Sequence, residues 1–143
     1  MPDKTIITVS GPIHGTYVVQ VNDHVITANC NQREQFRWRV NNNTSIAIQV
    51  FLDRFAIVGG GAEMPIDPNL PTTGTIEPGE HRPISARVRQ CAHGRATTRY
   101  SYWINPTNEF GEPLVVSQFF IVFDQTGLKF VTGVDPELDI EAV

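Results

Sequence analysis

The stretch that decides the fold is Gln35-Phe36-Arg37-Trp38-Arg39-Val40, in which polar and apolar side chains alternate without interruption. A period of two places Phe36, Trp38 and Val40 on one face of a β-strand and the two arginines on the other. Such a strand belongs to a sheet that covers a core on one side and meets solvent on the other. The polar run Asn41-Asn42-Asn43-Thr44 follows, and we expect it to end the strand.

Similar apolar segments recur outward from this stretch in both directions, separated by turn residues. We predict strands in residues 5–9, 17–21, 24–27, 35–40, 46–52, 84–89, 99–104 and 138–141, and a hairpin of residues 115–123 and 128–131. Residues 56–78 lack a clear period, so they form either an excursion of short strands or a functional loop. We therefore expect an all-β protein: a single domain over residues 1–143, folded as an antiparallel Greek-key β-sandwich of eight or nine strands.

Composition and charge support the β class and exclude several functions. Val, Ile and Thr together contribute 41 of the 143 residues, against 13 for Ala and Leu. No apolar run is long enough for a membrane span, and no apolar signal region opens the chain, so we expect no membrane contact and a cytoplasmic location by default. The formal net charge of −4 argues against a nucleic-acid partner.

The order of several short segments between residues 33 and 141 resembles the cupredoxins. These segments are Phe36-x-Trp38-x-Val40-Asn41-Asn42, the strand at 46–52, Thr75-Ile76-x-Pro78-Gly79-Glu80, the alternating strand to Val88, Tyr100-x-Tyr102 and Asp135-Pro136-Glu137-Leu138-Asp139-Ile140. The resemblance implies a cupredoxin-like sandwich of two sheets. It places the four copper ligands of that family at Ser45 or Ile46, Ile104, Thr107 and near Glu112. A blue-copper site needs two imidazoles, a thiolate and a weak axial donor, so we expect no copper and no other cofactor.

The four histidines are the remaining candidates for a relocated metal site. His14, His24, His81 and His93 show no HxH, HxxxH or CxxC-type spacing, so a metal site would need distant loops. The resemblance also places Cys30 and Cys91 at the end of the sandwich opposite the lost copper site. A disulfide there is geometrically allowed and would imply an oxidising compartment, but without a secretion signal we expect two reduced, partly buried thiols.

The sequence carries none of the common catalytic motifs, GxSxG, HExxH, GxxxxGK[ST] or GxGxxG. Glu109 and Glu112 are the loop carboxylates that a small hydrolase or lyase would use. The acidic residues of the last strand alternate along one face, and we expect a solvated acidic edge that discourages aggregation: Asp135, Glu137, Asp139 and Glu141. We lean against an enzyme.

Two surfaces are candidates for binding. Arg37, Arg39, Arg87 and Arg89, here called the arginine stripe, fall on the outer faces of two strands that the resemblance makes neighbours. Either nearby polar and acidic side chains neutralise them or they bind an anionic partner. The segment 114–123 is apolar on both faces and contains Phe119 and Phe120, so its second face needs the 56–78 segment or another protein chain as cover. A homodimer through this segment is the main partner hypothesis.

Three functions from different classes follow. The first is a metal-free cupredoxin-like module that binds a protein or ligand through the 105–113 and 56–78 loops or the Phe-rich strand. The second is an electron-transfer or metal-handling protein with a non-standard histidine site. The third is a small β-sandwich enzyme using loop carboxylates.

Overall fold

The computed structural model describes residues 1–124, 127–132 and 135–143, with the side chains of all of these except 117–124 and 127–132. Within these residues the chain forms no helix, so none is present there that could cross a membrane. The strands are β1 (Asp3–Ile13), β2 (Thr16–Val21), β3 (Val25–Asn29), β4 (Gln35–Thr44), β5 (Ile48–Ile57), β6 (Ile66–Asp67), β7 (His81–Val88), β8 (Thr97–Asn108), β9 (Val116–Asp124), β10 (Gly127–Thr132) and β11 (Glu137–Glu141).

The all-β prediction is confirmed, whereas the expected eight or nine strands were too few. β6 has two residues, which is too short to show an alternating pattern, and its pairing with β7 is what defines it as a strand. The predicted hairpin is present, because β9 and β10 pair antiparallel from Asp124 and Gly127 outward.

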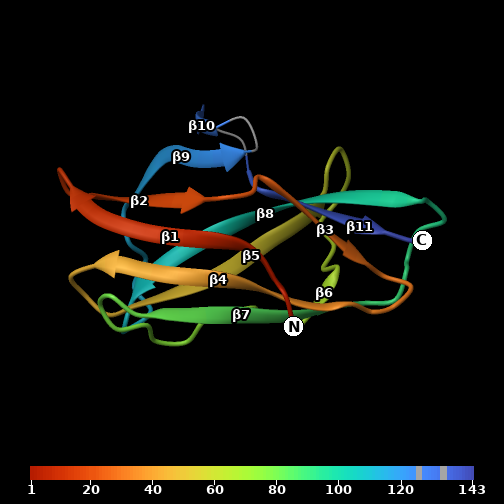
Figure 1. Ribbon diagram of the computed structural model, residues 1–143, viewed down its shortest axis with the longest axis horizontal. Helices are drawn as coiled ribbons and strands as arrows, with labels where there is room; N and C mark the ends of the chain where they lie inside the picture. The colour runs from red at the N-terminus through yellow and green to blue at the C-terminus, as the bar shows by residue number, and fades with distance from the viewer. Residues whose placement is uncertain (125–126, 133–134) are drawn as a thin grey trace.

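The strands form two sheets that pack face to face. One sheet has seven strands in the order β10-β9-β2-β1-β4-β7-β6, and the other has four in the order β3-β11-β8-β5. Figure 1 shows the four-stranded sheet behind the seven-stranded one. The prediction of an antiparallel sandwich was wrong, because both sheets are mixed: β1 runs parallel to β4, β2 to β9 and β3 to β11, while the other pairs are antiparallel.

The core lies between the sheets and is built from the inward-facing residues of the alternating segments. Phe36 and Trp38 of β4 and Tyr102 of β8 are fully buried. Trp38 Nε1 donates a hydrogen bond to Tyr102 Oη at 3.1 Å, and the Tyr102 ring stacks on Phe55 with the centroids 5.3 Å apart. Burial raises the pKa of Tyr102, because a phenolate in the core would lack solvation. These contacts join the two sheets through one aromatic cluster.

The polar run 41–44 does not end β4, contrary to expectation. Asn42 and Thr44 continue the inward side of the alternation, and Asn42 is completely buried. The Asn42 amide donates to the carbonyls of Ile46 and Ile76 at 2.8 and 2.9 Å, and its oxygen accepts from the Thr44 backbone N–H at 2.9 Å. A polar side chain whose hydrogen bonds are all satisfied can occupy a core position, so the strand continues.

Residues 58–80, here called the β5–β7 connection, form an excursion of short pairings. β6 pairs with β7, and isolated bridges join Thr72 to Phe51 and Ile76 to Ile48. The backbone N–H groups of Leu52 and Ile48 donate to the carbonyls of Pro71 and Ile76, both at 3.0 Å. The connection therefore covers the free edge of β5.

The last strand is not a solvated edge, which corrects the expectation for its acidic residues. β11 lies inside the four-stranded sheet, parallel to β3 and antiparallel to β8. Its outward carboxylates have basic neighbours: Arg99 holds Asp139 through two hydrogen bonds of 2.7 and 2.9 Å, and His24 lies 3.3 Å from Glu137. The opposite charge of Arg99 on the adjacent strand β8 thus pairs with Asp139 within the sheet.

Candidate functional site

A cavity of about 460 Å³ lies at the end of the sandwich where β3 and β11 finish and β8 begins. We call it the disulfide-end cavity. Five parts of the chain line it: the turn after β3, the β5–β7 connection, the segment from the end of β7 to residue 95, the start of β8 and the end of β11. The parallel pairing of β3 with β11 sets this geometry, because Cys30 N donates to Glu141 O at 2.9 Å and so brings residue 142 beside Cys30.

Cys30 and Cys91 form a disulfide in the wall of this cavity, so the expectation of two reduced thiols was wrong. The two Cα atoms are 5.2 Å apart although the residues are separated by 61 positions. Cys30 follows β3 and is buried, whereas Cys91 follows β7 and is exposed. The fold brings these two strand ends to the same end of the sandwich, as the resemblance implied, and this closes the distance that the sequence leaves open.

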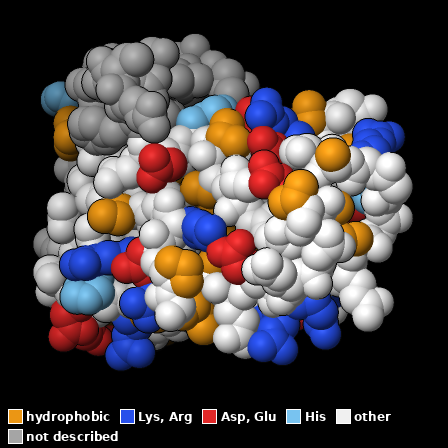
Figure 2. Space-filling view, turned by 45° about the vertical axis from the view of Figure 1, so that its right-hand side comes forward, with side chains coloured by type: hydrophobic (Ala, Val, Ile, Leu, Met, Phe, Trp, Pro, Cys, Tyr) orange, Lys and Arg blue, Asp and Glu red, His pale blue; other side chains and the backbone are white. Residues whose placement is uncertain are grey.

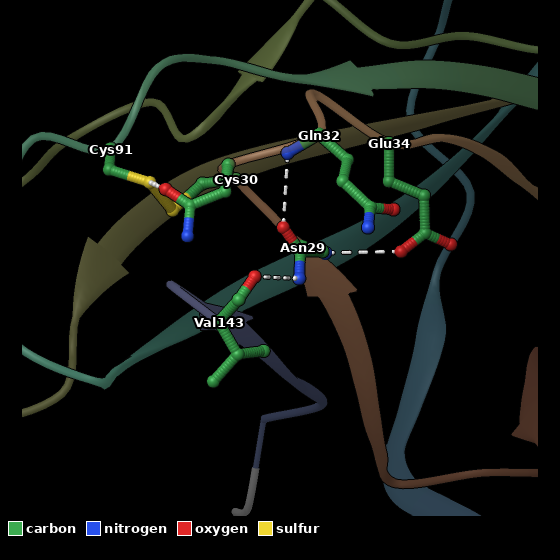
Figure 3. The surroundings of a disulfide bond; sticks show 7 residues. Asn29, Cys30, Gln32, Glu34, Cys91 and Val143 are labelled. Atoms are coloured by element: carbon green, nitrogen blue, oxygen red, sulfur yellow. Dashed lines mark hydrogen bonds between the residues drawn. A yellow bond between two sulfur atoms is a disulfide. The ribbon is translucent and has the colours of Figure 1, made fainter.

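The turn that carries Cys30 is held by Asn29 (Figure 3). The Asn29 side-chain oxygen accepts a hydrogen bond from Gln32 N at 3.1 Å, and its amide donates to the Val143 carbonyl at 3.0 Å. Its backbone N–H donates to a carboxylate oxygen of Glu34 at 3.1 Å. Asparagine favours such turns because its short side chain bonds to backbone groups nearby. The turn presents Arg33, which has a positive φ of 46°, to the cavity.

Glu63, Tyr100 and His93 form a hydrogen-bonded group on another wall. Glu63 Oε2 accepts a hydrogen bond from Tyr100 Oη and lies 2.8 Å from His93 Nε2. The tyrosine hydrogen bond, followed by that of His93, holds the pKa of Glu63 below its usual range. Burial, with the Glu63 carboxylate as a second cause, raises the pKa of Tyr100. The three groups therefore stay together as a carboxylate with two donors near neutral pH.

Three arginines line the cavity, and they differ in the number of acidic and hydrogen-bonding partners that each has. Arg89 donates to Asp67 at 2.9 Å, to the Met64 carbonyl at 3.2 Å and to Asn69. Arg33 Nη2 lies 3.8 Å from Asp67 Oδ2, which is longer than a hydrogen bond. Among the described residues no acidic side chain pairs with Arg95.

Three residues of the arginine stripe fall on two neighbouring strands, as expected, because β4 pairs antiparallel with β7, whereas Arg89 follows the end of β7. Arg37 forms an ion pair with Asp3 of β1. Arg39 donates to Asn41 Oδ1 at 3.2 Å and lies 3.5 Å from His81 Nδ1. Arg87 is directly opposite Gln35, and Arg89 turns to Asp67 and lines the cavity. Figure 2 shows basic and acidic side chains mixed over one face of the molecule. Asp3 and Asp67 thus neutralise part of the stripe.

The structure does not bring the four histidines together. In the described part of the chain no group of three or more His, Cys, Asp or Glu side chains could hold a metal ion. His14 lies in the turn between β1 and β2, with a positive φ of 51°. His24, His81 and His93 each contact a different side chain, namely Glu137, Arg39 and Glu63.

The loop carboxylates and the Phe-rich strand lie away from the disulfide-end cavity. Glu109 and Glu112 are exposed in the tight turn after β8, which Asn108 closes by accepting from the backbone N–H groups of Phe110 and Glu112. Phe119 and Phe120 belong to β9, which lies between β2 and β10. Their side chains, and with them the predicted cover on the second face of β9, lie outside the described residues.

Sequence reasoning missed most of the cavity. It proposed His93 only as a metal ligand, and it did not single out Glu63, Tyr100, Arg33 or Arg95. Two signals were available: Arg89, predicted as part of the arginine stripe, and the β5–β7 connection, predicted as a possible functional loop, which supplies Glu63, Met64 and Pro65 to the wall. Glu63 and Tyr100 are 37 positions apart, and no local pattern links them. Comparison of the chain with models of known protein families and with curated proteins finds no match.

Proposed function

We propose that the protein is a metal-free cupredoxin-like binding module and that the disulfide-end cavity is its binding site. The observation that carries the proposal is the cavity itself: about 460 Å³, with apolar walls from Met64, Val88 and Ile140 and with converging polar groups from Glu63 and Tyr100. Small-molecule sites typically combine a cavity of this size with apolar walls and a few placed polar groups.

The cupredoxin-like part of the proposal is supported by where the expected ligand positions fall. Asn42 bonds to the Ile46 carbonyl, and Ile48 pairs with Asn108, so the Ser45–Ile46 and Thr107–Asn108 segments lie at one end of the sandwich. The side chains there include Ile104 and Thr107, which are both buried and are poor copper ligands. For a Greek-key sandwich that retains the fold and lacks the metal ligands, we propose ligand binding as the function. We place the binding site at the end opposite the expected copper position.

The experiment is a screen of a fragment library by protein NMR, with the perturbed backbone amides mapped on the structure. We expect hits to shift amides around Met64, Val88 and Ile140 and to leave those of the 108–112 turn unchanged. Ala92→Trp places a large ring at the cavity wall and should weaken each hit at least about tenfold, or ~1.4 kcal/mol. Ser85→Trp, on the exposed outer face of β7, is the matched control.

The opposite pattern would contradict the proposal. Hits that cluster at the 108–112 turn, or hits that Ala92→Trp leaves unchanged, would move the binding site away from the disulfide-end cavity. A screen in which no fragment shifts the cavity amides would leave the cavity without a binding role.

A further inference from the structure

The disulfide-end cavity is lined by more basic than acidic side chains, and this excess of positive charge favours an anionic ligand. Glu63 is the one carboxylate among the lining side chains, and its Oε2 already accepts from Tyr100 and faces His93 Nε2 at 2.8 Å. Both contacts use Oε2, so a cationic ligand would be left with Oε1 of a carboxylate whose charge Tyr100 and His93 already stabilise. It would also have to approach three guanidinium groups, which repel it.

The available donors come from Arg33 and Arg95. Arg89 is held by Asp67, Asn69 and the Met64 carbonyl, so its hydrogen-bonding fork is largely occupied. Arg33 has only the long 3.8 Å approach to Asp67, and its side chain is 46% exposed. Arg95 has no acidic partner among the described residues. These two side chains come from two parts of the chain that both line the cavity, Arg33 from the turn after β3 and Arg95 from the segment after Cys91.

The rest of the cavity surface is largely apolar. Met64, Val88 and Ile140 come from three different parts of the chain, and Cys30, Cys91 and Ala92 line the same cavity. Met64 is half-buried and Ala92 is exposed, whereas Val88 and Ile140 are buried. Burying a hydrocarbon body against such a wall is favourable in proportion to the area removed from water. A small inorganic anion would leave this surface unused.

We infer that the disulfide-end cavity binds a small amphipathic anion: an apolar body that lies against Met64, Val88 and Ile140, with one anionic head group bound by Arg33 and Arg95. The inference rests on the proposed function and adds the chemical class of the ligand. Guanidinium groups bind carboxylate and phosphate through paired N–H donors, and both head groups share this chemistry.

The test compares probes that have the same shape and differ in charge. Isothermal titration at low ionic strength uses unbranched C4 to C10 carboxylates, the corresponding primary amides and the corresponding alkyl phosphates. We expect the best carboxylate or phosphate to bind at least about tenfold more tightly than the amide of the same length. The carboxylate and phosphate series then distinguish the two head groups.

Two variants, one double and one control, assign the effect to the named side chains. The double variant Arg33→Gln/Arg95→Gln should lower the preference for the anion over the amide to below about threefold, while amide binding is retained. Arg82→Gln is the matched control, because Arg82 is exposed on β7 and does not line the cavity. Circular dichroism confirms that each variant is folded.

The outcomes separate the two proposals. If amides bind in the cavity as tightly as the anions, or if the double variant keeps the full preference, the ligand class is wrong while the binding site stands. If no anion of any length binds but fragments still shift the cavity amides, the ligand class is again wrong. If neither anions nor fragments reach the cavity, the proposed function fails as well.

Discussion

Asn42 shows how one polar residue can hold a strand in the core. Its side chain makes four hydrogen bonds, to the carbonyls of Ile46 and Ile76 and from the backbone and hydroxyl of Thr44. These bonds fix the chain as it leaves β4, and they tie the β5–β7 connection to that point. The sequence alone predicts a turn at such an asparagine, because its partner Ile76 is 34 positions away and local patterns do not reveal the contact.

We predict that Asn42→Ala destabilises the protein by about 3 kcal/mol, because it removes four buried hydrogen bonds and takes away the side-chain acceptor of the Thr44 backbone N–H. The free energy of unfolding from urea titration measures the effect. Asn43→Ala is the control: Asn43 is the exposed neighbour, and its replacement should change stability by less than about 0.5 kcal/mol. Equal losses in the two variants would contradict the role of Asn42.

Glu63 makes stability depend on pH in a defined direction. Its pKa is held below the ordinary value of 4.5 in the folded protein, first by Tyr100 and then by His93. A lowered folded-state pKa contributes stability that is present above the unfolded-state value and is lost as the pH falls through the folded-state value. The contribution of Glu63 is therefore present at neutral pH and disappears in acid.

Glu63→Gln should cost about 1 kcal/mol at pH 7, because the two donors lose a charged acceptor. The difference between the variant and the original protein should shrink as the pH falls below 4.5. Urea titrations at pH 7 and pH 3 measure it, and Glu109→Gln in the exposed turn after β8 serves as the control. A difference that stays constant with pH would show that the charge of Glu63 contributes nothing.

At the level of elements, the disulfide fastens the segment after β7. Arg89 N bonds to the Pro65 carbonyl, and Ala96 O accepts from Ala142 N. Between these two bonds, the described contacts of the segment include the disulfide and the pairing of His93 with Glu63. The link spans 61 positions, and closing a loop of that length in the unfolded chain is worth roughly 4 kcal/mol in the chain-entropy model.

We therefore predict that the purified protein has no titratable thiol and an intact mass two hydrogens below that of the reduced chain. Adding a phosphine reductant should lower the free energy of unfolding by roughly 4 kcal/mol. The double variant Cys30→Ser/Cys91→Ser should have the lower stability from the start and should not respond to the reductant. Two free thiols under non-reducing, denaturing conditions would overturn the pairing.

At the level of the whole molecule, β9 raises the question of a partner. The sequence of this strand is apolar on both faces, but a sheet in a two-layer arrangement offers only one face to the core. The β5–β7 connection, which was one candidate for the cover, instead pairs with β5 and β7. A second copy of the chain accordingly stays our prediction for the other face.

We expect light scattering to give twice the 15.9 kDa of the chain. Phe119 and Phe120 are adjacent in the sequence, and the period of two predicts opposite faces for them. Of Phe119→Asp and Phe120→Asp, one should unfold the protein and the other should leave a folded monomer. A wild-type monomer at high micromolar concentration would rule the homodimer out.

The sequence by itself determined where most strands lie and which residues face the core. The alternation in 35–40 and 99–104 placed Trp38 and Tyr102 on inward faces, because a period of two depends only on neighbouring residues. It failed where tertiary contacts outweigh local preference: Asn42 stays in β4 because distant carbonyls satisfy it, and β11 is interior because β3 and β8 flank it.

Only the tertiary structure decided the disulfide and the candidate site. Cys30 and Cys91 meet because the ends of β3 and β7 lie at the same end of the sandwich, and Glu63 meets Tyr100 because the β5–β7 connection returns to that end. Pairings of this kind depend on the order of the strands in the sheets. Among the described strands, three pairs of parallel neighbours are distant in sequence, namely β1–β4, β2–β9 and β3–β11. Local periodicity carries no information about which strands become neighbours, so the cavity could not be foreseen from the residues that line it.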